Sequence, residues 1–268
     1  PPKGTSAQEA FGFADGLSQQ VLRGTRKAEL PDSADHLVEP GEVVLGYADN
    51  SGFIPKSPVR ASAASWEQRE LGRNGTFLVV RQLEQDVASF DAYLAECAKD
   101  PAVQAAVPHG VQAETWIAAK MMGRWQNGSS LVRNPQQPGK LERPDKPDND
   151  FRFAGDRNGL YCPLGSHIRR ANPRDSFDPT AEDPLRIVNR HRILRVGRSY
   201  DTGQSRGIMF MCLNADIERQ FEFIQQSWVL ARSFHGLPDE ADPLLSPSTC
   251  MTIPTESGPV LLRDVKQF

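Results

Sequence analysis

The spacing of apolar residues changes character several times along the chain. Over residues 1–60, turn residues interrupt every short apolar piece, which predicts extended chain and loop. A β-favouring tract at 76–87 then leads into residues 87–99, where apolar residues recur at helical spacing. This part of the chain therefore predicts a strand followed by a helix.

Four later tracts also carry regular patterns. Residues 113–125 predict an amphipathic helix, and residues 186–200 alternate Ile, Val and Leu with Arg, as a half-buried strand does. Residues 207–215 form a nearly continuous apolar run of strand length. Residues 216–230 predict a second amphipathic helix, with Asp216 as its N-cap.

Long polar connections separate these units. Residues 133–150 and 175–184 are rich in proline and charge, so they predict surface loops. Strand and helix units joined in this way favour an α+β fold with helices on one face of an antiparallel sheet. A parallel, doubly wound fold is disfavoured because no Gly-rich strand-to-helix turn of the dinucleotide-binding type occurs.

Composition narrows the possible functions. No apolar run in the 268 residues approaches the roughly 20 that a membrane-spanning helix needs. The net charge of −3 lacks the basic excess expected of a nucleic-acid binder. Four cysteines without a C-x-x-C pair indicate neither a disulfide scaffold nor a thiolate zinc site.

Asp15 is the first candidate for chemistry. Gly12 and Gly16 flank it and permit tight backbone geometry and the close approach of a planar ligand. Phe11 and Phe13 make the surroundings apolar, so the carboxylate could serve as a poised base. The competing interpretation is an ordinary Asp-Gly turn.

His167 is the second candidate. Leu164 and Ile168 give it an apolar side, and the arginines that follow give it a cationic side. These two sides suit a flat hydrophobic ligand with acidic groups, such as haem, whose iron a histidine can ligate. The competing interpretation is a core histidine bonded to a carbonyl.

Arginine density is the third signal. Residues 167–198 contain eight arginines, no lysine and four acidic residues, which gives 8 − 4 = +4. Arginine favours planar, bidentate contacts to carboxylates or phosphates, so an anion is expected nearby. For some of these side chains, among them Arg186, Arg190, Arg192 and Arg198, a solvated strand face would explain the pattern equally well. Nucleic acid is a poor fit because neither interleaved aromatic residues nor a recognition helix accompanies them.

Five tracts, in this order, resemble those of the dye-decolorizing peroxidases, a family of haem peroxidases: GFADG, PGEVVLGY, CPLGSHIRRANPRD, HRILRVGRSY and CLNADIERQFEFIQQSW. The resemblance runs from about residue 11 to 262. It implies a pair of ferredoxin-like α+β domains of the dimeric α+β barrel type, with haem b held mainly by the second. It also implies a peroxidase that reduces hydrogen peroxide through an oxoferryl intermediate and oxidises dyes, phenolics or other aromatic reductants.

The resemblance also implies roles for single residues. His167 matches the proximal iron ligand, Asp15 the distal acid–base residue and Arg195 the distal arginine. Glu222, or alternatively Asp216, would accept the proximal imidazole N–H. The side chains expected to contact the haem propionates are Arg170, Arg174, Arg190 and His191.

Bulky dyes cannot reach a buried haem, so their oxidation at the surface would need a relay of aromatic residues. Tyr200, five residues beyond Arg195, is the first candidate for this relay, and Trp228 is the second. Both could equally be packing residues.

The chain departs from the family at both ends. Its GFADG tract begins at residue 12, whereas the resemblance implies most of a first ferredoxin-like domain ahead of it. The resemblance likewise implies a further strand after LLRDVKQF, so we expect this sequence to be a fragment. We expect 1–72 to be a remnant of that domain and 73–268 to form the haem-binding one. The missing part would lie in a second chain, or a reduced chain would form a homo-oligomer.

One alternative function stays open at this point. A haem-binding or iron-handling protein, similar to a deferrochelatase, would share His167 but need not use Asp15 and Arg195. The sequence does not decide between a cytoplasmic and a secreted protein.

Overall fold

A computed structural model describes residues 8–59, 71–141 and 148–268. Parts of the predicted first unit and of the predicted loop at 133–150 lie outside these residues, namely 1–7, 60–70 and 142–147. The described chain has an α+β fold with small, mostly antiparallel sheets, as the sequence predicts. No helix in these three stretches is long and apolar enough to cross a bilayer.

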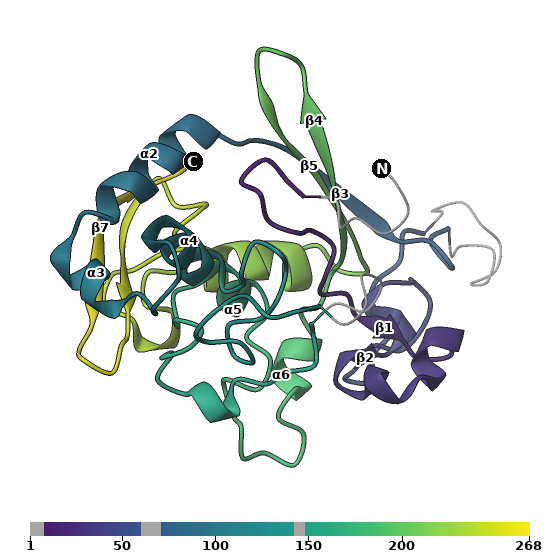
Figure 1. The fold of residues 1–268 in the computed structure, drawn as a ribbon. Coiled ribbons are helices and arrows are strands. Elements are labelled where there is room, and N and C mark those ends of the chain that lie inside the picture. The colour runs from purple at the N-terminus through teal and green to yellow at the C-terminus, as the bar shows by residue number, and fades with distance from the viewer. Residues whose placement is uncertain (1–7, 60–70, 142–147) are drawn as a thin grey trace.

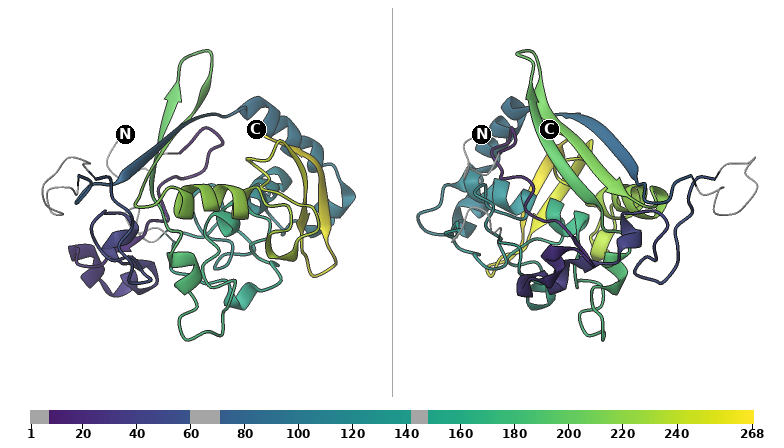
Figure 2. Two further views of the ribbon diagram at one scale, coloured as in Figure 1. Left: turned by 180° about the vertical axis from the view of Figure 1, so that it is seen from behind. Right: turned by 90° about the vertical axis from the view of Figure 1, so that its right-hand side faces the viewer.

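The largest sheet has three antiparallel strands in the order β3-β5-β4 (Figure 1). Their bounds are Phe77–Glu84 for β3, Leu194–Asp201 for β4 and Arg206–Asn214 for β5. The strands predicted at 76–87 and 207–215 are thus confirmed. The β4–β5 hairpin projects beyond the rest of the chain in all three views (Figures 1 and 2).

The two faces of this sheet differ. Arg195 pairs with Cys212, so both side chains point to one face, and Val196 points to the other because side chains alternate along a strand. The Arg195 face is covered in part by a helical segment, whose Phe221 ring lies 6.1 Å from that of Phe210. On the opposite face Leu78, Val80 and Val196 are exposed.

Three helices follow β3 in the chain: α2 (Val87–Cys97), α3 (Pro101–Ala106) and α4 (Ala113–Met122). Helix α2 begins where the Asp86 side chain accepts the Ser89 N–H. Helix α4 stops three residues short of the predicted end because Gly123 takes a left-handed conformation with φ 97°. Helix α2 packs on α4 and not on the three-stranded sheet, so the expected single helical layer is only partly present.

The region from 167 to 229 corrects one expectation. Residues 186–189 form a short helix, α6 (Arg186–Asn189), whereas the alternating pattern predicted a strand from 186. Asp183 explains the difference because its side chain accepts the N–H of Leu185 and turns the chain before the strand can begin. The predicted helix after β5 is present as two π-helical segments. The remaining bounds here are α5 His167–Ala171, η5 Glu218–Glu222 and η6 Ile224–Val229.

Short elements complete the fold. A parallel pair, β1 and β2, lies beside three 3₁₀ helices in the N-terminal part, and an antiparallel hairpin, β6–β7, lies near the C-terminus (Figure 1). The bounds are β1 Val21–Leu22, η1 Arg26–Glu29, η2 Pro31–His36, β2 Leu37–Val38, η3 Pro40–Glu42, η4 Ala154–Asp156, η7 Phe234–Gly236, β6 Ser248–Ile253 and β7 Val260–Lys266.

The main core is built around α4. Trp116, Ile117 and Met121 are buried there together with side chains from α2, the β6–β7 hairpin and the segment at 11–13. This core therefore anchors the loop that carries Asp15 and packs against α5, which begins with His167.

Candidate functional site

His167 opens α5 and is held by a buried carboxylate. Its Nδ1 lies 2.9 Å from Oδ2 of Asp242, whose side chain is 0 % exposed. Asp242 is itself fixed, because its Oδ1 accepts the N–H groups of Leu244 and Leu245. Since a carboxylate accepts, we assign the imidazole proton to Nδ1, which leaves the lone pair on Nε2.

The Nε2 side of His167 is open. The side chain is 28 % exposed, and no described residue forms a hydrogen bond with Nε2. A neutral imidazole with this tautomer, oriented by a carboxylate on its other nitrogen, is the form that ligates a metal. The Nε2 of His167 is thus suited to ligate a metal ion.

The partner of His167 corrects the sequence prediction. Glu222 is exposed on η5, and Asp216 uses its Oδ1 to accept the Arg219 N–H, so neither meets the imidazole. Asp242 occupies that position instead. The use of Asp216 as a cap for the helical segment agrees with the prediction, although Ile217 is the residue that immediately precedes η5.

Buried arginines fix α5 in place. Arg169 donates to Oδ2 and O of Asp156 and to O of Cys162, and both members of this ion pair have side chains only 2 % exposed. Arg170 is fully buried and donates to the carbonyls of Gly165, Trp228, Ala231 and Glu240. The expectation that Arg170 contacts a propionate is therefore corrected, because backbone carbonyls occupy its guanidinium.

Asp15 and Arg195 form a second pair. Oδ1 of Asp15 lies 3.2 Å from Nη1 of Arg195, although 180 residues separate them in the chain. Their side chains are 21 % and 33 % exposed, so the pair faces open space. The side chain of Gln19 adds a contact by donating to the Arg195 carbonyl.

The loop that carries Asp15 has the backbone geometry its glycines allow. Gly12 and Gly16 have φ values of 86° and 75°, which L side chains adopt only with strain. Gln126, just beyond α4, clamps the loop: its backbone carbonyl accepts the Ala14 N–H, and its side chain donates to the Phe11 carbonyl. Asp15 therefore lies in a loop that hydrogen bonds to Gln126 hold in place, and not in an isolated Asp-Gly turn.

A group of buried cations lies close to Arg195. Burial and then the charges of Arg174 and Arg192 lower the pKa of His36 to about 4. Burial and the charge of Arg195 lower the pKa of Arg192 to about 10. Burial, together with neighbouring guanidinium groups, lowers the pKa of Arg174 to about 9 and that of Arg124 to about 10. We call Arg124, Arg174, Arg192 and Arg195 the cationic cluster, beside which the imidazole of His36 stays neutral near pH 7.

Within the cationic cluster, Arg192 gives the clearest indication of an anion-binding site. Its side chain is buried, with the residue 8 % exposed, and no described residue accepts a hydrogen bond from its guanidinium. A largely buried guanidinium without a protein acceptor is well suited to bind an acidic ligand. For this arginine the interpretation as a solvated strand face is wrong.

The other residues expected at the propionates have different surroundings. Arg174 is buried, stacks on the Phe151 ring and donates to Asn149. Arg190 is exposed, and the His191 ring stacks on that of Phe223 with 3.9 Å between centroids. Contacts of these three with propionates stay a prediction.

The two relay candidates occupy different places. Tyr200 is five residues beyond Arg195, so it points to the opposite face of the sheet, and its hydroxyl donates to the Leu83 carbonyl. Trp228 is buried, with its ring edge-on to that of His191 at 5.1 Å. Both side chains pack against protein, and their role as a relay stays a prediction.

Sequence reasoning missed Asp242 and His36, and it left Arg192 open between an anion contact and a solvated strand face. Asp242 lies in an acidic stretch, PDEADP, that differs little from a surface loop, and only its burial distinguishes it. Arg192 belongs to the arginine-rich tract, so the excess charge there was a usable signal.

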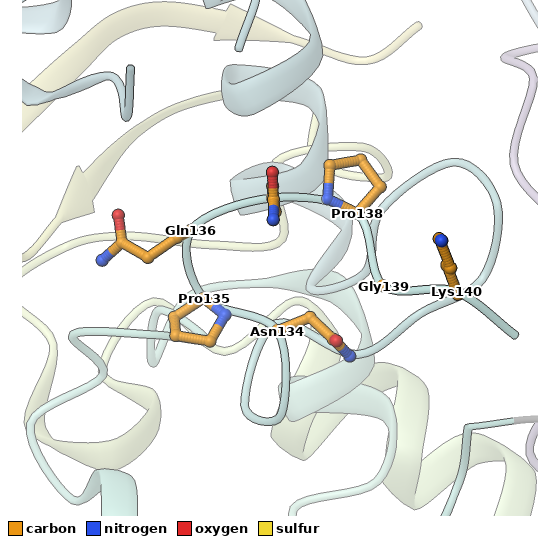
Figure 3. A pocket seen from close by; sticks show the side chains of 7 residues that line it. Asn134, Pro135, Gln136, Pro138, Gly139 and Lys140 are labelled. Atoms are coloured by element: carbon orange, nitrogen blue, oxygen red, sulfur yellow. The ribbon is translucent and has the colours of Figure 1, made fainter. Parts of the chain in front are cut away.

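A polar hollow of about 550 Å³ lies elsewhere, on the loop at 134–140 (Figure 3). Prolines, amides, Gly139 and Lys140 line it, and none of these is a predicted site residue. It contains no pair of groups suited to acid–base chemistry.

Comparisons with known proteins identify relatives along most of the chain, although no family model matches. A dye-decolorizing peroxidase of Mycena epipterygia is 30 % identical over 251 residues, which cover 85 % of this chain and 43 % of the relative. The multifunctional dye peroxidase DyP2 of an Amycolatopsis strain is 30 % identical over 254 residues, covering 89 % and 50 % respectively. A deferrochelatase of Escherichia coli is 35 % identical over 94 residues, covering 33 % and 19 %.

The fold agrees with these relatives. The structure of an ancestral D-type dye-decolorizing peroxidase is 25 % identical, superposes with a TM-score of 0.74, and is matched over 100 % of this chain and 59 % of its own. The chain spans about half the length of the curated relatives it matches. On these grounds the chain belongs to the DyP-type peroxidase family.

Proposed function

We propose that this chain is the haem-binding part of a peroxidase that reduces hydrogen peroxide and oxidises aromatic dyes or phenolics. The observation that carries the proposal is the His167–Asp242 pair, which leaves Nε2 of His167 without a partner among the described residues. The chain also holds an Asp15–Arg195 ion pair of the kind that the distal side would need. Membership of a family of haem peroxidases supports this interpretation.

The residues present fit haem b. His167 Nε2 would ligate the iron, and the cationic cluster, with the unpaired Arg192 in it, would bind the propionates. No three His, Cys, Asp or Glu side chains gather into a direct metal site within 8–59, 71–141 and 148–268. Iron held within a porphyrin therefore suits the described residues better than iron held by protein ligands alone.

Haem, when bound, supplies the two electrons and the open coordination position that peroxide reduction needs. In this proposal, Asp15 accepts a proton from one peroxide oxygen and delivers it to the other, which then leaves as water. Its Oδ2 has no hydrogen-bond partner among the described residues, so it is available for this transfer. The Arg195 guanidinium stabilises negative charge on the leaving oxygen.

Oxidation of large reductants would take place at the surface. Trp228 is the better placed relay candidate, since its ring contacts those of His191, Phe223 and Phe177, and Phe177 is 38 % exposed. Tyr200 would serve molecules that bind the opposite face of the three-stranded sheet.

We further propose the division into 1–72, a remnant of a first ferredoxin-like domain, and 73–268, the haem-binding ferredoxin-like domain. A three-stranded sheet with one uncovered face supports it, because a second domain, a second chain or another copy would cover that face. The partial match to a deferrochelatase keeps one alternative, a haem-handling protein with little peroxidase turnover.

An absorption experiment tests the proposal. The purified chain is titrated with haem and then mixed with one equivalent of hydrogen peroxide, and the Soret band is followed. We expect binding that His167→Ala abolishes, and a peroxide reaction that Asp15→Asn slows by about 10²–10⁴-fold. Glu222→Gln, an exposed carboxylate on η5, is the matched control and should change neither.

Two results would contradict the proposed haem peroxidase function. If His167→Ala bound haem as well as the wild type, the ligand assignment would be wrong. If haem bound through His167 but Asp15→Asn reacted at the wild-type rate, the haem-handling alternative would be favoured.

A further inference from the structure

Gly197 lies on β4, where this strand meets the loop that carries Asp15. It is two residues beyond Arg195 on β4, so both face the same side of the sheet. A Cβ atom built on Gly197 would overlap Oδ2 of Asp15 and Cδ1 of Ile208. The carboxylate therefore occupies the space that any other residue would fill with its side chain.

The two oxygens of Asp15 are held differently. Oδ1 accepts the Gly16 N–H at 2.6 Å and lies 3.2 Å from Arg195 Nη1. Oδ2 lies over the bare Cα of Gly197. The missing side chain thus determines which way the carboxylate is turned: one oxygen toward the arginine and the other along the strand.

The backbone conformation at position 197 does not require a glycine. Gly197 is absent from the residues with positive φ, unlike Gly12 and Gly16, and it lies within a regular ladder opposite Phe210. The atoms that a Cβ would meet are the ends of two side chains, not backbone. Alanine should therefore leave the strand intact and displace the carboxylate or the isoleucine.

We propose that Gly197 is a positioning residue: it provides the space that lets the Asp15 carboxylate lie on β4 in contact with Arg195. The inference rests on the proposed function of Asp15 but concerns how the chain places it. With a methyl group at 197, the carboxylate turns away from Arg195 and loses its place for proton transfer.

The first test needs no haem. In the haem-free chain, the amide proton resonance of Gly16 reports the short bond to Asp15 Oδ1. We expect Gly197→Ala to shift this resonance upfield, in the direction that Asp15→Asn shifts it. Val196→Ala, on the opposite face of the same strand, is the matched control and should leave it unchanged.

The second test uses the haem-loaded chain and one equivalent of hydrogen peroxide. We expect Gly197→Ala to slow the reaction by about 10-fold or more, and to add little when Asp15→Asn is already present. Should Gly197→Ala fold poorly, the double variant Gly197→Ala with Ile208→Val reduces the overlap with the isoleucine and leaves the one with Asp15.

The outcomes distinguish the positioning role of Gly197 from the proposed catalytic role of Asp15. An unchanged Gly16 resonance in a folded Gly197→Ala chain would overturn the positioning role, and so would a rate loss of equal size with and without Asp15. If the resonance shifts but Asp15→Asn reacts at the wild-type rate, the placement is supported and the proposed function of Asp15 fails.

Discussion

The two sides of the candidate site are held in different ways. On the proximal side, His167 bonds to a carboxylate that is 0 % exposed, and buried arginines fix α5 through backbone carbonyls. At the proposed distal pair, a loop and a strand meet through the partly exposed Asp15–Arg195 ion pair, 180 residues apart in the chain, and through contacts of Gln19 with the Arg195 backbone. The His167–Asp242 pair is thus anchored by buried groups, whereas the Asp15–Arg195 pair depends on how two separate segments are positioned.

This difference predicts where substitutions act. Changes on the proximal side remove partners from buried groups, so they should affect haem binding and stability together. Changes on the distal side should affect the peroxide reaction and leave binding and folding nearly unchanged, because exposed pairs contribute little to stability.

The largest effect on binding among the following tests is expected for Asp242→Asn. The amide can still accept the N–H groups of Leu244 and Leu245, but its NH₂ group donates to Nδ1 of His167 and moves the proton to Nε2. Haem affinity, measured by Soret titration, should fall about 10–100-fold. Asp216→Asn, a carboxylate outside the pair, serves as control; equal affinities for the two variants would contradict the proximal assignment.

Arg192→Leu should separate stability from binding. Arg192 is largely buried, has no protein acceptor among the described residues and is repelled by the charge of Arg195. Its removal should therefore raise the free energy of unfolding of the haem-free chain by about 1 kcal/mol, measured in urea. It should also weaken haem binding several-fold, because a partner of the propionates is lost.

The control for Arg192→Leu is Arg198→Leu, whose side chain is exposed on β4. Both quantities should stay near the wild-type values in that variant. If the haem-free Arg192→Leu chain were less stable than the wild type, Arg192 would have a stabilising partner within the protein, which would contradict its proposed role in binding an anion.

The smallest effect on haem binding is expected at the contact between Glu42 of the N-terminal segment and Arg219 of η5, where a substitution should change only stability. Burial raises the pKa of Glu42 to about 7, although Arg219 lies 2.9 Å away. Because the folded chain holds this proton more tightly than the unfolded one, the contribution of Glu42 to stability falls as pH rises from about 4.5 to about 7. Over that window the loss should be up to about 3 kcal/mol, since each pKa unit corresponds to about 1.4 kcal/mol.

Glu42→Gln tests this in urea unfolding at pH 5 and pH 7.5. The difference in unfolding free energy between the two pH values should shift by that amount relative to the wild type. Glu39→Gln, a partly exposed neighbour paired with Arg23, should keep the wild-type difference. A Glu42→Gln profile that matches the wild type would show that this carboxyl does not titrate in the window.

Much of the fold could be predicted from local pattern. The strands at β3 and β5 and the helices at α2 and α4 follow the spacing of their apolar residues, and the loop at 175–184 follows its prolines and charges. The short helix α6 was missed because the Asp183 side chain turns the chain there, against an alternation that favours a strand. Gly123 ended α4 early for a similarly local reason.

For the site, the sequence by itself determined the chemical types: one histidine before an arginine-rich tract, an aspartate between glycines, and an excess of positive charge that calls for an anion. The tertiary structure decided which groups meet. Asp242 became the partner of His167 through burial, and Asp15 met Arg195 across 180 residues over the space left by Gly197. The physical reason is that hydrogen bonds, burial and the fit of a carboxylate over a glycine depend on distances in space, which the order of residues along a chain does not contain.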